Sequence, residues 1–110
     1  MSAPPATHFL LVAYDAADGK RAEFRDQHLT RAKPYHEAGT LVVGGPMLSD
    51  DKSKMIGSTL ILKAEGDFET LEKVWHYIHT DPYFLNDVWD KNRIAVHPFY
   101  PGAGVSFGRQ

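Results

Sequence analysis

The sequence contains no cysteine. This absence excludes a disulfide framework, a thiolate nucleophile and any zinc site with cysteine ligands. It is consistent with a reducing compartment. Residues 1–7 carry two prolines and no basic or apolar signal, so we expect no secretion signal and a cytoplasmic protein.

Two further features are missing. The chain has 12 Lys and Arg against 14 Asp and Glu, a net charge of -2, so we expect no nucleic-acid partner. No apolar run approaches the roughly 20 residues that span a bilayer, so we expect no membrane association. What remains, 110 residues that are 43% hydrophobic and 24% charged, is typical of one globular domain.

Four short segments have the composition of β-strands. Residues 8–14 are apolar on both faces, which predicts that both faces of their sheet are covered. Residues 40–44, 57–63 and 93–97 predict three further strands. We expect Gly45 and Pro46 to stop the second strand, and residues 47–56 to form a polar loop.

Two segments have helical patterns. Residues 20–38 predict a first helix with Gly39 as its C-cap, and Pro34 is expected to kink or divide it. Its side chains at helical spacing form one stripe: Ala22, Arg25, Leu29, Ala32 and His36. A second helix is expected after Asp67 as N-cap, with an apolar stripe of Phe68, Leu71, Val74, Trp75 and Ile78. Asp81 and Pro82 are expected to open a short helical turn through residue 84.

The predicted element order is βαββαβ, an α+β fold with a four-stranded antiparallel sheet of ferredoxin-like type. Helices in this arrangement cover one face of the sheet. The second apolar face of residues 8–14 therefore predicts a partner sheet, and two sheets packed face to face would give a dimeric α+β barrel. We expect a homodimer.

Five segments resemble the YCII-related (YciI-like) domain family, in matching order and spacing. They are R-x-x-H-L at residues 25–29, a glycine-bounded apolar run ending in Gly-Pro at 39–46, Gly57-Ser58, D-P-Y at 81–83 and V-x-P-F at 96–99. The resemblance implies a ferredoxin-like dimeric α+β barrel. We assign residues 8–101 to this domain, between a flexible leader at 1–7 and a mobile tail at 102–110.

The resemblance also implies an active site made of a histidine and an aspartate, here His28 and Asp81. Some members resemble enzymes that remove HCl from hydroxylated, chlorinated aromatic rings with a histidine as base. Histidine exchanges protons near neutral pH, and a carboxylate is its usual orienting partner. The alternatives are a helix histidine bonded to backbone and an aspartate that only caps its helix.

Three further residues are candidate substrate-binding groups. Arg25, one turn before His28, could hold an anionic or phenolate group, or could be solvated or paired with an aspartate. Ser58 could donate a hydrogen bond into a pocket or be a plain edge serine. Tyr83, together with Phe84 and Trp89, could wall an apolar pocket around a ring-shaped substrate or pack in the core and the dimer interface. His76 and His79 lack a third ligand at a known spacing, so we predict no metal site.

These observations lead to one principal hypothesis and two alternatives. The principal one is a cofactor-free enzyme that uses the His28–Asp81 dyad for elimination or hydrolysis on a small molecule, with aromatic rings as candidates. One alternative is a non-catalytic small-ligand-binding or dimerisation module. The other is an oxygenase-like barrel that binds haem or activates oxygen unaided.

Overall fold

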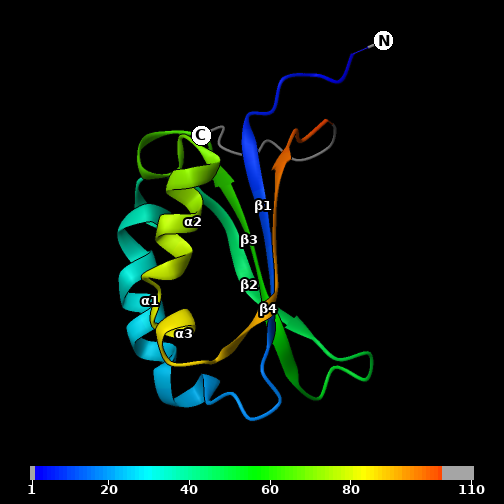
Figure 1. The fold of residues 1–110 in the computed structure, drawn as a ribbon, viewed down its shortest axis with the longest axis vertical. Helices are drawn as coiled ribbons and strands as arrows, with labels where there is room; N and C mark the ends of the chain where they lie inside the picture. The colour runs from blue at the N-terminus through cyan, green and yellow to red at the C-terminus, as the bar shows by residue number, and fades with distance from the viewer. Residues whose placement is uncertain (1, 103–110) are drawn as a thin grey trace.

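The computed structural model describes residues 2–102 (Figure 1). The elements follow in the order β1 (His8–Asp15), α1 (Arg21–Glu37), β2 (Leu41–Leu48), β3 (Met55–Lys63), the 3-10 turn η1 (Gly66–Phe68), α2 (Leu71–His79), α3 (Pro82–Leu85) and β4 (Trp89–Phe99). All neighbouring strands are antiparallel, in the order β2-β3-β1-β4. The predicted ferredoxin-like α+β fold is therefore confirmed.

The core lies between the sheet and the helices, which all cover one face (Figure 1). Phe9, Leu11 and Ala13 of β1 point into it, since alternate residues of a strand share a face. The core is completed by buried side chains from the other elements, among them Leu60, Leu62, Phe68, Val74 and Ile78.

The opposite face of β1 carries Leu10, Val12 and Tyr14, which are only half-buried. No helix of residues 2–102 covers this face (Figure 1). The partner sheet expected there stays a prediction.

Several predicted strand boundaries were wrong. β2 continues through Gly45 and Pro46 to Leu48. Proline is tolerated because β2 is an edge strand that pairs only with β3. The outer side of β2 has no partner strand, so a missing N–H on that side costs no hydrogen bond between strands. The loop is accordingly shorter, spanning residues 49–54, and β4 begins at Trp89 rather than at residue 93.

The short loop is closed by one carboxylate. Asp51 accepts hydrogen bonds from the Ser53 hydroxyl, the Ser53 backbone N–H and the Ser49 hydroxyl. These bonds, led by that of the Ser53 side chain, lower the pKa of Asp51 to about 2. The predicted polar loop is thus a defined turn.

The first helix differs from its prediction in two ways. α1 is not divided at Pro34, which lies near its C-terminus and removes only one backbone donor. Its one buried residue is His28, while Leu29 of the predicted stripe is 47% exposed. The face toward the core runs through Phe24, His28, Ala32 and Tyr35 and shares only Ala32 with the predicted stripe.

The second helix begins later than predicted. Its N-cap is Thr70, whose side chain accepts a hydrogen bond from the Lys73 N–H at 3.2 Å. Asp67 lies in η1 and instead accepts a hydrogen bond from the Tyr35 hydroxyl. α3 begins after Asp81, as predicted.

The segment just before β1 is held by backbone hydrogen bonds of Thr7. The Thr7 N–H donates to the carbonyl of Phe99, and the Thr7 carbonyl accepts from the Ala64 N–H, beside the end of β1. The tail predicted to be mobile lies, from residue 103 on, outside the described residues. None of the helices within residues 2–102 has the length and apolar character needed to cross a membrane.

Candidate functional site

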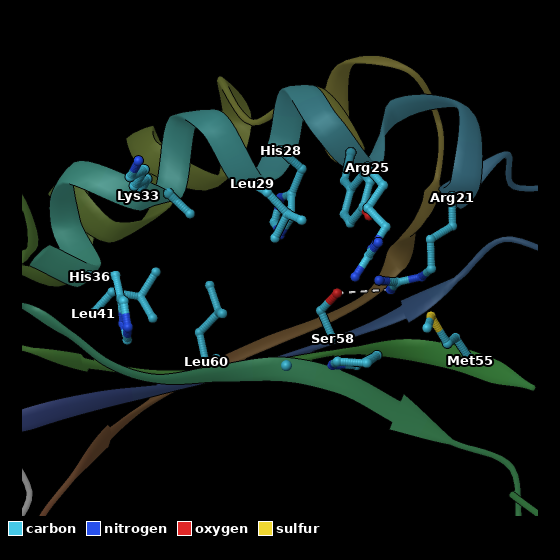
Figure 2. Close-up of a pocket in the computed structure, with 15 residues that line it drawn as sticks. Arg21, Arg25, His28, Leu29, Lys33, His36, Leu41, Met55, Ser58 and Leu60 are labelled. Atoms are coloured by element: carbon cyan, nitrogen blue, oxygen red, sulfur yellow. Dashed lines mark hydrogen bonds between the residues drawn. The ribbon is translucent and has the colours of Figure 1, made fainter.

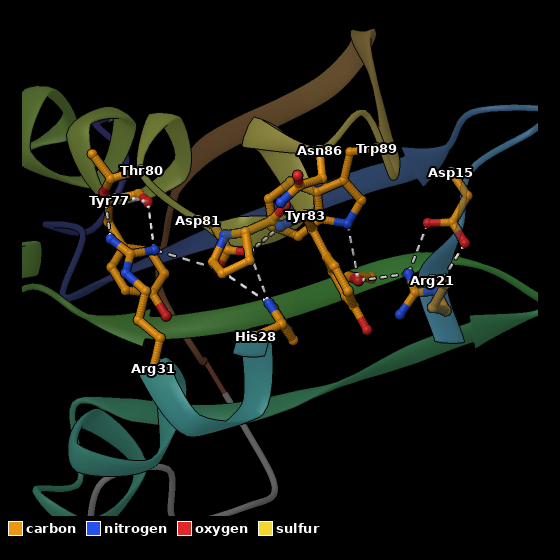
Figure 3. A network of polar contacts seen from close by, with 12 residues as sticks. Asp15, Arg21, His28, Arg31, Tyr77, Thr80, Asp81, Tyr83, Asn86 and Trp89 are labelled. Carbon is orange, nitrogen blue, oxygen red and sulfur yellow. Dashed lines mark hydrogen bonds and ion pairs between the residues drawn. The ribbon is translucent and has the colours of Figure 1, made fainter. Parts of the chain in front are cut away.

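Helices α1 and α3 bring together two residues that are 53 positions apart, His28 and Asp81 (Figure 3). The His28 Nδ1 atom lies 2.9 Å from Oδ1 and 3.1 Å from Oδ2 of the Asp81 carboxylate. Asp81 is fully buried and His28 is 8% exposed. A buried hydrogen bond of this length fixes the orientation of the imidazole.

The Asp81 carboxylate has two further donors. The Tyr83 backbone N–H donates to Oδ1 at 2.8 Å, which caps α3, and Arg31 Nη1 approaches Oδ2 at 3.4 Å. Capping and histidine contact thus coexist, because a carboxylate has lone pairs for both. Because a carboxylate only accepts hydrogen bonds, this contact calls for a proton on Nδ1 of His28, and a neutral imidazole of that tautomer has its lone pair on Nε2.

Arg31 itself is anchored on three sides. It donates to the Tyr77 carbonyl at 2.9 Å and to the Thr80 hydroxyl, and its guanidinium lies 4.0 Å from the centre of the Tyr77 ring. These contacts hold a positive charge beside Asp81 (Figure 3).

Two aromatic rings enclose the His28 imidazole. The Tyr83 ring stacks on it, and the Trp89 ring meets it edge-on, with centroids 5.9 Å apart. Tyr83 and Trp89 are both 1% exposed. Burial raises the pKa of the Tyr83 hydroxyl, against the lowering influence of Arg21.

Ser58 belongs to a second polar network. Its Oγ accepts hydrogen bonds from Arg21 Nη2 at 2.8 Å and from Trp89 Nε1 at 3.1 Å. Because both partners can only donate, they use the two lone pairs, and the Ser58 O–H remains free to donate elsewhere. Ser58 is not an edge residue, since β3 lies between β2 and β1.

Arg21 is fixed by Asp15, which it contacts with two nitrogens at 2.8 Å each. Burial by itself would lower the pKa of the guanidinium, but the pairing with Asp15 outweighs it and raises that pKa. Arg21 also lies over the Tyr83 ring, 4.8 Å from its centre. The aspartate thus offsets the charge of this arginine.

A cavity of about 420 Å³ lies between α1 and the strands β2 and β3 (Figure 2). We call it the α1 groove. Its polar end is formed by Arg21, Arg25, His28, Ser58 and Tyr83. Arg25 makes no ion pair within residues 2–102, so its charge is available to a ligand.

The structure therefore groups all five predicted site residues. His28, Arg25, Ser58 and Tyr83 line the α1 groove, and Asp81 lies behind His28.

Sequence reasoning missed Asp15, Arg21 and Arg31. The two arginines carried a readable signal, because Arg21 lies seven residues before His28 and Arg31 three residues after it, on the same side of a helix. Asp15 carried none, since only the fold places it beside Arg21.

The two histidines considered as metal ligands lie elsewhere. The ring of His79 packs against Trp75 and Phe84, with centroids 5.6 Å and 4.9 Å away. Within residues 2–102, no group of three or more His, Cys, Asp or Glu side chains has the arrangement of a metal site.

The fold and the groove can now be compared with known proteins. A model of the YCII-related domain matches residues 7–98. The chain belongs to the YCII-related domain family.

Two relatives are similar to this chain in sequence. The xenovulene A biosynthesis cluster protein asL2 of Sarocladium schorii is 30% identical over 82 residues, 69% of each chain. The derivative of benzaldehyde biosynthesis cluster protein C of Emericella nidulans is 36% identical over 69 residues, 57% of this chain and 66% of the relative.

A solved structure is also similar to this YCII-related protein. It is the 5-chloro-2-hydroxyhydroquinone dehydrochlorinase (TftG) from Burkholderia phenoliruptrix AC1100, in complex with 2,5-dihydroxybenzoquinone. The TM-score is 0.71 and the identity 25%, over 86% of this chain and 95% of the other.

Proposed function

We propose that this chain is a cofactor-free enzyme that transfers a proton to or from a small, hydroxylated, ring-shaped molecule. This proton transfer leads to elimination or to a related hydrolytic step. The observation that carries the proposal is the hydrogen bond of 2.9 Å between His28 Nδ1 and buried Asp81, beside a cavity that His28 lines. This arrangement leaves Nε2 as the proton-accepting atom.

The other groups of the polar end have supporting roles in this proposal. Arg25 binds an anionic oxygen of the ligand, and the free Ser58 hydroxyl donates a hydrogen bond to another. Tyr83 holds the imidazole in its plane by stacking. Deprotonating a hydroxylated ring creates negative charge, which Arg25 stabilises as it forms.

The likeness to a dehydrochlorinase supports the choice of reaction class. Net loss of HCl takes one proton from the substrate and releases chloride with the electron pair of the broken C–Cl bond. No oxidant or reductant is needed, so one positioned base and one anion site suffice. Whether a halide or another group leaves depends on the substrate.

The test is proton exchange with solvent, which needs no knowledge of the leaving group. Hydroxylated benzenes and benzoquinones are incubated with the protein in D₂O, and the loss of ring C–H signals is followed by proton NMR. We expect exchange that His28→Ala abolishes and Asp81→Asn slows at least tenfold. Release of chloride from 5-chloro-2-hydroxyhydroquinone is measured in parallel.

The same experiment distinguishes the non-catalytic alternative. Binding of these compounds with no exchange above the His28→Ala background would mean that the chain is a ligand-binding module. In that case His28 and Asp81 would have a structural role.

We also propose that two copies pack through the uncovered sheet face. Leu10, Val12 and Ile61 lie at its centre, with Leu10 paired to Ile61 across β1 and β3. Burying these side chains would stabilise so small a domain. Light scattering at micromolar concentration should give the mass of two chains, and Val12→Glu should give one; a monomeric wild type would refute the dimer.

A further inference from the structure

The α1 groove extends well beyond the polar end that the proposed function uses. Residues from Arg25 to His36 of α1 line it, a stretch of about 16 Å at ~1.5 Å per helical residue. Figure 2 shows Arg21, Arg25 and Ser58 at one end, and Lys33, His36 and Leu41 at the other. Its volume of about 420 Å³ falls in the range of ~300–1,000 Å³ typical of sites for drug-sized ligands.

The part of the groove beyond His28 has a different chemistry. Leu29 and Ala32 from α1 line it together with Leu41 from β2 and Leu60 from β3. Figure 2 shows Leu29 on the helix side of the groove and Leu60 on the sheet side. No charged side chain lies among these four. The groove thus joins a cationic, hydrogen-bonding end to an apolar stretch.

The exposure of Leu29 fits a ligand-binding role. Leu29 is 47% exposed although it faces a cavity, whereas Leu41 and Leu60, on the opposite wall, are 6% and 4% exposed. Gly44 leaves room for the two leucines of that wall, because a Cβ at this position would come within 2.9 Å of both the Leu41 and Leu60 side chains. An apolar substituent lying in the groove would cover Leu29 without any movement of the core.

The far end sets a limit. Lys33 and His36 line the far end of the groove, where Leu41 also lies, and both are exposed (Figure 2). An apolar chain gains nothing once it reaches these polar groups and water. The apolar stretch therefore accommodates a substituent of several carbon atoms and no more.

We propose that the ligand of this site is an amphipathic anion: a hydroxylated ring with an acidic oxygen at Arg25, bearing an apolar substituent of several carbons that lies along Leu29, Ala32, Leu41 and Leu60. This inference rests on the proposed function for the position of the ring. It adds that a bare ring fills only part of the site, and that the substituent determines specificity.

The test is a binding series measured by titration calorimetry. The probes are 2,5-dihydroxybenzoquinone and its 3-methyl, 3-propyl and 3-hexyl derivatives. Burial of a methylene group is worth ~0.8 kcal/mol, so we expect about threefold to fourfold tighter binding for each added carbon until the groove is full. A longer 3-dodecyl probe should bring no further gain per carbon.

Two variants assign the effect to the two ends of the groove. Leu29→Ser should reduce the preference for the hexyl over the bare ring by at least fivefold, because it removes one apolar wall. Leu71→Ser, at a similarly exposed leucine of α2 outside the groove, is the matched control and should leave the preference unchanged. Arg25→Gln should weaken all probes by a similar factor.

The outcomes separate this inference from the proposed function. Equal affinity for the bare and the substituted rings, or a preference that Leu29→Ser does not alter, overturns the inference and leaves His28-dependent proton exchange intact. If no probe binds, the inference fails, and the exchange experiment then decides on the proposed function by itself. Affinity that rises with chain length in wild type and less in Leu29→Ser supports the inference.

Discussion

The imidazole of His28 lies parallel to the ring of Tyr83, with centroids 4.0 Å apart and an angle of 8° between the planes. Tyr83 also donates its backbone N–H to the carboxylate of Asp81, the N-cap of α3, so one residue contacts both His28 and Asp81. The plane of the imidazole is set by this stacking, and its rotation within that plane is set by the bond from Nδ1 to Asp81.

Tyr83→Leu should therefore lower the rate of proton exchange more than it lowers the affinity for the ligand. Leucine keeps an apolar side chain but cannot stack, so we expect a fall of about 1–3 kcal/mol in the free energy of unfolding and a tenfold or greater loss of proton-exchange rate. Tyr83→Phe keeps the stacking and is the control. A rate in Tyr83→Leu equal to that in Tyr83→Phe would contradict the role of stacking.

Two substitutions at Asp81 should separate capping from catalysis. Asparagine can still accept the Tyr83 N–H but carries no charge, so Asp81→Asn should lower the free energy of unfolding by about 1.5–3 kcal/mol. Asp81→Ala loses the cap and leaves Arg31 without its carboxylate, and should lower it by about 3–5 kcal/mol. Urea unfolding measures both values.

The exchange rates of the same two variants should not follow their stabilities. We expect Asn and Ala to slow proton transfer to a similar extent, because both remove the charge that orients His28. Nitrogen-15 NMR of His28 reports the tautomer directly. A wild-type spectrum with the proton on Nε2 would rule out the proposed base.

Gly57 should tolerate no side chain, for reasons of space. A Cβ there would collide with the backbone oxygen of Ala13 and come within 2.5 Å of the Met47 side chain. We expect Gly57→Ala to lower the free energy of unfolding by at least ~2–3 kcal/mol. Gly45 in β2 has no atom within 4 Å of the position that a Cβ would take, so Gly45→Ala is the control and should change stability by less than ~0.5 kcal/mol. Equal effects of the two substitutions would show that Gly57 is not needed for close approach.

Tyr77→Phe should stabilise the protein. Within residues 2–102, the Tyr77 hydroxyl is buried and has no hydrogen-bond partner, and removing such a group should raise the free energy of unfolding by about 1 kcal/mol at pH 7. Tyr35→Phe is the contrast, because the Tyr35 hydroxyl donates to Asp67 and its loss should bring no gain.

The gain at Tyr77 should also depend on pH. Burial raises the pKa of the Tyr77 hydroxyl above the value of about 10 in the unfolded chain. The folded form then holds its proton where the unfolded form loses it, so stability is unaffected below pH 10 and falls as the pH rises above it. Tyr77→Phe should reduce this alkaline loss; an unchanged pH profile would argue against a buried phenol.

Parts of the site could be predicted because they follow local rules. Asp81 before Pro82 signals a helix start, and α3 begins there. Arg25 and His28 are three apart on one helix, so their proximity in the α1 groove follows from helical geometry. Ser58 was identified as a candidate, but its hydrogen bonds from Arg21 and Trp89 were not, because these residues come from distant elements.

Errors arose where local patterns compete with the surroundings. Pro46 reads as a strand breaker, yet it is compatible with β2 because that strand lies at the edge of the sheet. Leu29 reads as a core residue of α1, yet the core side belongs to His28 and Phe24. Sequence periodicity does not show which of two adjacent helical faces meets the sheet, because polar residues such as His28 can be buried when they have partners.

The sequence by itself determined the order of strands and helices, the ferredoxin-like sheet and the residue types available for proton transfer, because hydrophobic periodicity and turn chemistry act over short segments. Only the tertiary structure decided which charges are satisfied and which are free. Asp15 pairs with Arg21 and Asp81 with His28, while Arg25 makes no ion pair within residues 2–102. That distribution depends on distances between α1, α3 and β3, which the packing of the core fixes and no local pattern records.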